Sequence, residues 1–192
     1  MQRDAGAAPL LVIMGVSGCG KTTVGAALSQ RLGLPFADAD DFHSPANIAK
    51  MSAGIPLDDR DRLPWLAALG GWLAQRQPTG GLLSCSALKR TYRDALRASC
   101  PTLTFIHLDP PADVVRRRMA GRLGHFMPAS LIDSQFQSLE RLHSDEHGIV
   151  LDLDRPAADL MTECLTALPQ FADLAHRQDP NGVPQRPTTL KG

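Results

Sequence analysis

A glycine-rich segment near the start of the chain constrains its fold more than any other feature. The segment reads GVSGCGKTT from Gly15, follows an apolar run at residues 10–14, and precedes a helical pattern of apolar residues that begins at Lys21. It matches the pattern G-x-x-x-x-G-K-[ST] in the strand-to-helix setting which that pattern requires. Such a turn at a helix N-terminus exposes backbone N–H groups to phosphate. The segment therefore predicts a nucleoside triphosphate site; a strand-to-helix turn without a ligand is the alternative.

The residue types in this loop suit a bound nucleotide. Glycines tolerate positive φ and let the backbone approach phosphate oxygens. Lys21 would place a positive charge at the β and γ phosphates, and the Thr22 hydroxyl would bind Mg²⁺. We therefore expect ATP and Mg²⁺ as cofactors. The expected cofactor-binding residues of the loop are Gly15, Ser17, Gly18, Cys19, Gly20, Lys21, Thr22 and Thr23.

Short apolar runs alternate with helical patterns along the rest of the chain. Strands are predicted at 10–14, 81–85, 103–108 and 149–153, with a shorter one at 34–37. Helices are predicted at 21–32, 45–51, 64–76, 89–99, 112–122, 129–142 and 157–168. This alternation is typical of a three-layer α/β fold, with a five-stranded parallel sheet and helices on both faces. We expect one domain over residues 1–175 and a disordered polar tail over 176–192.

Composition excludes several classes of protein. Lys and Arg total 20 and Asp and Glu total 20, so the net charge is zero and no general field favours nucleic acid or an anionic membrane. The first apolar run is too short for a signal peptide or a membrane span. The four cysteines are scattered along the chain and no two of them form a C-x-x-C pair, which favours a reducing compartment. We therefore expect a cytoplasmic protein.

An acidic segment, DADDFH, follows the second predicted strand. Carboxylates at the carboxyl end of a parallel strand open into the crevice where α/β sheets bind ligands. Asp38 and Asp40 alternate on an extended segment, so we expect both in the site. Carboxylates placed there could orient Mg²⁺ and accept a proton from an acceptor hydroxyl, and the residues alone leave open which aspartate takes which role. A solvated loop or a helix N-cap is the alternative for each aspartate, Asp41 included.

Two other classes of nucleotide-binding protein lack their second motif here. No guanine-reading N-K-x-D follows the loop, which argues against a GTPase. The third predicted strand, within GLLSCSAL, ends in serine and cysteine where an ATPase motor would carry adjacent acids.

Four strings in order resemble the gluconate kinases (gluconokinases), which are relatives of shikimate kinase among the small P-loop kinases. They read GVSGCGKTT, DADDFHSPANIAKMSAGIPLDDRDRLPWL, CSALKRTYRDALR and GRLGHFMPASLIDSQFQSLE, and the resemblance covers residues 10–168. It implies ATP-dependent phosphorylation of D-gluconate at its terminal hydroxyl, giving 6-phospho-D-gluconate. It also implies a helical substrate-binding insertion at about 41–78, a lid at about 118–130 and a homodimer.

The resemblance also implies which residues bind gluconate and transfer the phosphoryl group. Lys89 and Arg93, four residues apart on a predicted helix, would supply cations for the carboxylate. The expected substrate-binding residues are Asp40, His43, Asn47, Lys50, Ser86, Lys89 and Arg93. Lys21, Asp40 and Arg122 are the expected catalytic residues, with Asp40 at the family's position for the proton acceptor. Thr22 and Asp38 are the expected ligands of Mg²⁺.

A second arginine, Arg118, lies four residues before Arg122 and would bind the nucleotide phosphates. Solvated helix faces are the alternative for Lys50, Lys89 and Arg93, and capping of its own helix is the alternative for His43.

Two rival functions keep the nucleotide loop. A kinase for another hydroxy acid or polyol, such as shikimate, would change only Lys89, Arg93 and the region 43–61. A regulatory module that binds ATP without catalysis would not use Asp40 for turnover.

Overall fold

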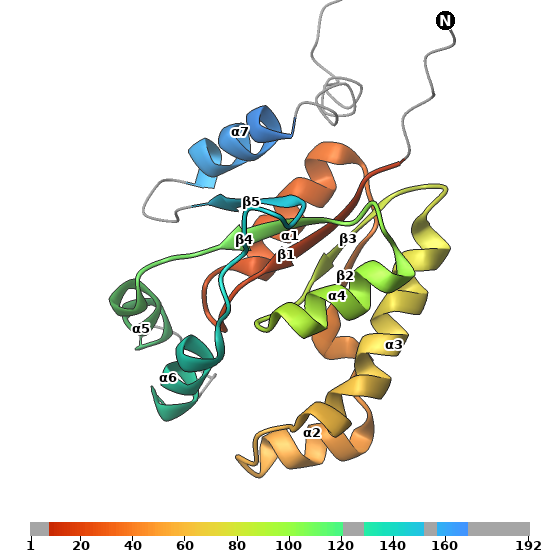
Figure 1. Ribbon diagram of the computed structural model, residues 1–192. Helices are drawn as coiled ribbons and strands as arrows, with labels where there is room; N and C mark the ends of the chain where they lie inside the picture. Colours follow the sequence, from red (N-terminus) through yellow and green to blue (C-terminus); the bar gives the residue numbers. More distant parts are fainter. Residues whose placement is uncertain (1–7, 121–128, 152–156, 169–192) are drawn as a thin grey trace, which may run out of the picture.

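The computed structural model describes residues 8–120, 129–151 and 157–168, and its five strands form one parallel sheet in the order β2-β3-β1-β4-β5 (Figure 1). The strands are β1 (Leu10–Met14), β2 (Phe36–Asp38), β3 (Gly81–Ser84), β4 (Thr104–Leu108) and β5 (Gly148–Leu151). Every pairing is parallel, and β1 pairs with β3 on one side and with β4 on the other. Every residue of β1 is buried, which explains its continuous apolar run.

Helices cover both faces of this sheet, as Figure 1 shows. They are α1 (Lys21–Leu32), the 3-10 helix η1 (Ala39–Phe42), α2 (Pro45–Ser52), α3 (Asp59–Arg76), α4 (Arg90–Ser99), α5 (Ala112–Ala120), α6 (Ala129–Ser138) and α7 (Ala157–Ala167). The three-layer α/β fold predicted from the sequence is confirmed. In Figure 1, α2 and the start of α3 extend past the sheet on one side, and α5 and α6 lie on the other. None of the helices in these described ranges has the length and apolar character to cross a membrane.

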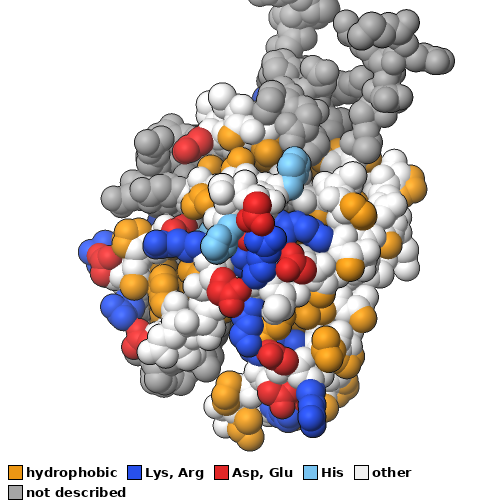
Figure 2. All heavy atoms as spheres, in the orientation of Figure 1, with side chains coloured by type: hydrophobic (Ala, Val, Ile, Leu, Met, Phe, Trp, Pro, Cys, Tyr) orange, Lys and Arg blue, Asp and Glu red, His pale blue; other side chains and the backbone are white. Residues whose placement is uncertain are grey.

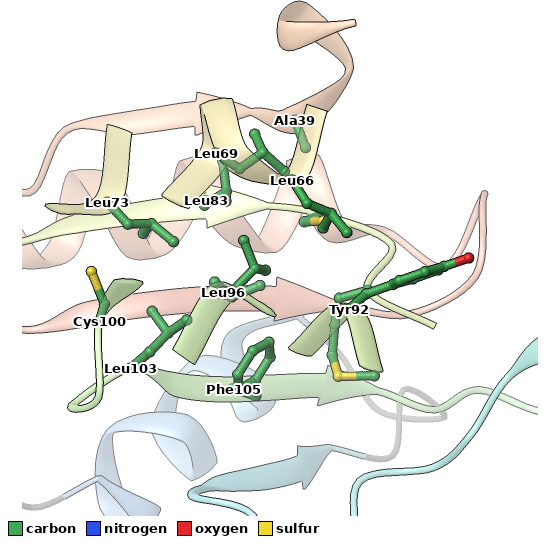
Figure 3. Close-up of a cluster of buried hydrophobic side chains, with 14 of the residues drawn as sticks. Ala39, Leu66, Leu69, Leu73, Leu83, Tyr92, Leu96, Cys100, Leu103 and Phe105 are labelled. Atoms are coloured by element: carbon green, nitrogen blue, oxygen red, sulfur yellow. The ribbon is translucent and has the colours of Figure 1, made fainter. Parts of the chain in front are cut away.

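The alternation of side chains along each strand separates two apolar cores. Leu11 and Ile13 of β1 point into a core formed with α1, α5, α6 and α7. Leu10, Val12 and Met14 point to the opposite face, where α3 and α4 pack. Figure 3 shows this second core, in which leucines of α3 and α4 meet the strands and Ala39 lies at one edge.

Among the described residues, a boundary of two helices differs by more than one residue from the prediction. Helix α3 begins at Asp59 rather than at Pro64, because Asp58 and Asp61 form a capping box ahead of the proline. The Asp61 N–H donates to Asp58 Oδ1 at 2.8 Å, and the Asp58 N–H donates to Asp61 Oδ2 at 3.1 Å. Helix α6 ends at Ser138, four residues before the predicted end. The predicted end of α5 at residue 122, the segment 121–128 of the predicted lid and the predicted tail lie outside the described residues.

A buried ion pair attaches the segment after α6 to α4. The side chains of Arg93 and Glu146 are both 0% exposed, and two guanidinium nitrogens lie 2.7 Å from the two carboxylate oxygens. Arg97 donates to the same carboxylate at 2.8 Å. Burial alone would raise the pKa of Glu146, but the hydrogen bonds from Arg93 and Arg97 outweigh it and lower the pKa to about 2. The native state therefore depends on an ionised Glu146.

Glu146→Gln is expected to lower the free energy of unfolding by about 3–5 kcal/mol, because it leaves the Arg93 guanidinium buried without its anion. Urea denaturation measures this loss. Asp145→Asn is the matched control, since Asp145 is exposed and its ion pair with Arg90 is worth at most about 1 kcal/mol.

The same variant tests the pH dependence. Because the pKa of Glu146 is lower in the folded state than its ordinary 4.5, its contribution is complete above about pH 4.5 and lost as the pH falls toward 2. The wild type should therefore lose more stability over this range than Glu146→Gln. Equal losses in the two proteins would contradict the assigned role.

Candidate active site

The glycine-rich loop between β1 and α1 has the backbone that its sequence predicts. Gly15, Gly18 and Gly20 have φ values of 139°, 78° and 104°, which L side chains rarely adopt. At Gly15 space is limiting as well, because a Cβ would lie 2.5 Å from the Leu108 carbonyl oxygen. The Gly15 N–H donates to the Ser86 carbonyl at 3.2 Å, so Ser86 contributes its backbone here. The loop is thereby fixed at the carboxyl end of the sheet.

Lys21 and Thr22 lie where the loop enters α1. Lys21 Nζ donates to the carbonyl oxygens of Gly15 and Val16, each at 3.0 Å, so the ammonium lies over the loop. Thr22 Oγ1 donates to Asp38 Oδ2 at 3.0 Å, and Thr23 is exposed. This hydrogen bond brings the predicted metal-binding pair, Thr22 and Asp38, into contact.

These two side chains fit a magnesium site. Hydroxyl and carboxylate oxygens are the donors that Mg²⁺ prefers, and protein sites commonly supply one or two carboxylates and leave the other positions to phosphate and water. Within the described ranges no group of three or more His, Cys, Asp or Glu side chains could hold a metal ion. Thr22 and Asp38 thus suit a metal that arrives with a nucleotide.

Helices α5 and α6 contact the loop from its other side. The Ser17 N–H donates to Gln135 Oε1 at 2.6 Å, and Arg118 Nη1 donates to the Cys19 carbonyl at 3.4 Å. The side chain of Met119 lies against Gly18. Arg118 is therefore placed beside the loop. Gln135 was missed by sequence reasoning, because nothing in its local sequence indicates a partner so far away along the chain.

The acidic segment forms a tight turn beside the loop. Asp38 Oδ1 accepts from the Asp40 N–H at 3.2 Å and so caps η1, while Asp40 and Asp41 are exposed. Partial loss of solvent around the carboxylate, and then the negative charge of Asp38, raise the pKa of Asp40, although Lys21 opposes this shift. A carboxylate with a raised pKa is a better proton acceptor near neutral pH.

The predicted substrate residues in α2 and just before it divide into two groups. His43 stacks on Trp65, with ring centroids 4.7 Å apart and planes 9° apart, and burial lowers its pKa. Asn47 is buried and donates to the Asp61 carbonyl at 2.9 Å. Lys50 Nζ lies 2.7 and 2.8 Å from the two carboxylate oxygens of Asp61. Asn47 and Lys50 therefore attach α2 to the start of α3.

A second polar cluster joins the starts of α3 and α4. Lys89 Nζ donates to Asp59 Oδ1 at 3.0 Å, and the Tyr92 hydroxyl donates to the same oxygen at 2.5 Å. The Arg62 guanidinium lies 5.6 Å from the centre of the Tyr92 ring. Tyr92 lies at the edge of the second core with its hydroxyl pointing out of it (Figure 3). This cluster already accommodates a carboxylate, that of Asp59. Sequence reasoning found Lys89 but missed Arg62 and Tyr92.

Arg93 does not join this cluster. Its guanidinium is bound to Glu146 and also donates to the carbonyls of Ala87, Leu88, Glu140 and Arg141, so it has no donor to spare for a substrate. Lys89 is the N-cap residue of α4, and its ammonium is bound to Asp59 whereas Arg93 is bound to Glu146. The expectation that these two residues form one carboxylate site therefore needs correction. Arg122 lies outside the described residues.

The loop, the acidic turn and the sheet order together define a P-loop nucleotide-binding protein. Figure 2 shows basic and acidic side chains intermixed on the face that α4 presents, as the balanced charge predicts.

Comparisons with known proteins narrow this class. The family model for shikimate kinase matches residues 17–168. Gluconokinase of Gluconobacter oxydans (strain 621H) is 49% identical over 138 residues, which cover 71% of this chain and 78% of that protein. Thermosensitive gluconokinase of Escherichia coli (strain K12) is 43% identical over 160 residues, covering 82% and 86%. The crystal structure of a gluconokinase from Sinorhizobium meliloti 1021 has a TM-score of 0.78 and 45% identity, and the match covers 89% and 97%. The chain belongs to the gluconokinase family, within the wider shikimate kinase family.

The burial of the four cysteines, one of them in the loop, leads to a prediction about their reactivity. Cys19, Cys85, Cys100 and Cys164 are all buried, and burial raises the pKa of Cys19 and raises those of Cys85 and Cys164 to about 12. Because the thiolate is the reactive form, we expect a disulfide reagent at pH 8 to label none of the four thiols quickly in the folded protein and all four after denaturation. Rapid labelling of one thiol in the native protein would show that the assigned burial is wrong.

Proposed function

We propose that this protein transfers the γ-phosphoryl group of ATP to the terminal hydroxyl of D-gluconate, giving ADP and 6-phospho-D-gluconate. One observation carries the proposal: Thr22 Oγ1 lies 3.0 Å from Asp38 Oδ2, which joins the nucleotide loop to the turn that carries Asp40. This contact supports a phosphoryl donor and a proton acceptor side by side, in a chain of the gluconokinase family.

The nucleotide is bound by the loop in this proposal. Backbone N–H groups of the loop donate to phosphate oxygens, and Lys21 moves from the carbonyls of Gly15 and Val16 to the phosphates. Thr22 and Asp38 would hold a magnesium ion, which would neutralise charge on the phosphates. Arg118, beside the loop, supplies a further cation, and Arg122 stays a predicted catalytic residue.

Asp40 receives the proton of the acceptor hydroxyl. The hydroxyl oxygen forms a bond to the γ phosphorus, the bond between that phosphorus and the ADP oxygen breaks, and the hydroxyl proton passes to the Asp40 carboxylate. The raised pKa of Asp40 favours this transfer. Asp40 also orients the hydroxyl, because its own backbone is fixed by the cap from Asp38.

The gluconate carboxylate is assigned to the cluster of Lys89, Arg62 and Tyr92. Lys89 and the Tyr92 hydroxyl already bind the carboxylate of Asp59, and the Arg62 guanidinium lies over the Tyr92 ring as a second cation nearby. His43, with a neutral ring beside the turn, is assigned to a hydroxyl of the same substrate. Arg93 has a structural role in this proposal, and the homodimer and the cytoplasmic location stay predictions.

Coupled assays of ADP release across a panel of sugar acids and shikimate test the substrate. We expect D-gluconate to give the highest kcat/KM. A preference for shikimate would replace the proposal with its first rival. ATP binding without ADP release on any acceptor would favour a regulatory module.

Asp40→Asn tests the proton acceptor. The carboxamide keeps the shape but accepts no proton, so kcat should fall at least about 100-fold. ATP affinity, measured by calorimetry, should change little. Asp41→Asn makes the same chemical change on the same turn and should keep kcat within about threefold of the wild type. Lys21→Ala should weaken nucleotide binding as well as turnover. A kcat for Asp40→Asn above one tenth of the wild-type value would exclude Asp40 as the acceptor.

Lys89→Met tests the carboxylate cluster. Loss of one charge-assisted hydrogen bond costs about 1.5–3 kcal/mol, so the KM for gluconate should rise about 10-fold or more while the KM for ATP stays the same. Arg90→Met is the matched control, because the neighbouring Arg90 pairs with the exposed Asp145 away from the cluster. An unchanged KM for gluconate would remove Lys89 from the site.

A further inference from the structure

Trp65 of α3 lies directly beneath the turn that carries Asp40. Its side chain is almost fully buried, at 5% exposure, and its indole Nε1 donates to the Ala39 carbonyl at 2.7 Å. Ala39 is the first residue of η1 and is itself 1% exposed. A buried indole usually finds a partner for its N–H, and here that partner is the backbone next to the proposed proton acceptor.

Trp65 also contacts the other end of the same turn. The imidazole of His43 stacks on the indole with nearly parallel planes, and His43 is the residue at which η1 ends. The His43 N–H donates to the Asp40 carbonyl at 3.4 Å. Its Nδ1 is buried with no hydrogen-bond partner among the residues that the structure describes, so stacking on Trp65 is what orients the ring.

The turn is therefore held at three points. Asp38 caps it through the Asp40 N–H, the Trp65 indole binds its first carbonyl, and the His43 stack fixes its last residue. The first contact comes from the turn itself, whereas both of the others come from one side chain of α3. A small displacement of this backbone would move the Asp40 carboxylate relative to the attacking hydroxyl.

We propose that Trp65 is a positioning residue for phosphoryl transfer, which sets the place of the Asp40 carboxylate through the Ala39 carbonyl and the His43 ring. This inference rests on the proposed role of Asp40. A shift of about 1 Å in a reacting group can cost about 100-fold in rate, so one hydrogen bond to the turn can matter as much as a group that touches the substrate. Nucleotide binding, in contrast, should not depend on the indole.

The chain offers a matched control. Trp72 lies two turns further along α3, beside Gly81 and with the Arg76 guanidinium 5.0 Å from its ring centre. Gly81 begins β3, so Trp72 lies at the end of the sheet opposite to the site. Trp65 and Trp72 both cover the sheet, but only Trp65 contacts η1. Comparing them separates a positioning role from core packing.

Trp65→Phe removes the N–H donor and keeps an aromatic ring for His43. We expect kcat for gluconate to fall about 10- to 100-fold, with the KM for ATP unchanged within twofold. Trp72→Phe should keep kcat within twofold. Where Trp65→Phe folds poorly, benzothienylalanine at position 65 replaces the N–H by sulfur with nearly the same shape, and the same loss of kcat is expected.

A double-mutant cycle with Asp40→Asn decides whether Trp65 acts through Asp40. Trp65→Phe should lower the rate at least 10-fold in the wild-type background but less than twofold in the Asp40→Asn background. Equal factors in both backgrounds, or an unchanged kcat in Trp65→Phe, would overturn the inference. Failure of the proposed function is a separate result, because it would appear as a wild-type protein that does not phosphorylate gluconate.

Discussion

The first glycine of the phosphate-binding loop lies where strands from three parts of the chain end, and no side chain fits there. A Cβ on Gly15 would meet the Leu108 carbonyl at the end of β4, while the Gly15 N–H is bound to the Ser86 carbonyl just after β3. The loop is therefore clamped from both sides of β1. Because β3 and β4 flank β1, the chain continues to opposite sides of the sheet at this point. The carboxyl ends of the strands leave a crevice there, in which open α/β sheets bind their ligands. The same order brings Asp38 of β2 within reach of Thr22.

Basic side chains around this crevice have two different roles. The net charge of zero does not reveal this difference. Arg93 is enclosed by Glu146 and by backbone carbonyls, so its charge holds α4 to the segment that precedes β5. Lys89, only one turn away, is more than a third exposed and binds the exposed carboxylate of Asp59. A buried guanidinium with every donor used cannot exchange partners cheaply, whereas an ammonium at the surface can. This difference supports the proposed substrate-binding role of Lys89 and the proposed structural role of Arg93.

Most of the fold could be predicted from local sequence, because it depends on local signals. The apolar run at residues 10–14 and the glycines around α1 locate the first strand and helix. The start of α3 was missed because the proline signal at Pro64 outweighed the capping box at Asp58. In the site, the loop and the acidic turn were predicted because each is one continuous segment. The buried ion pair of Arg93 was not predicted. Spacing along a helix does not reveal which of its faces will be covered by a segment about 50 residues away in the sequence. Nothing in the apolar pattern of α3 indicates that the Trp65 N–H reaches the Ala39 carbonyl.

In this structure the hydrogen-bond donors of the loop bind oxygen atoms of the protein. Lys21 binds two carbonyls, Thr22 binds a carboxylate, and the Ser17 N–H binds the amide oxygen of Gln135. Phosphate oxygens can replace such partners without a change of backbone conformation, because the positive φ values of the glycines already set the loop. Gln135 differs from the other partners because it belongs to α6, which follows the segment 121–128 along the chain. Exchange of this partner for a phosphate oxygen at Ser17 would therefore break a hydrogen bond that joins α6 to the loop.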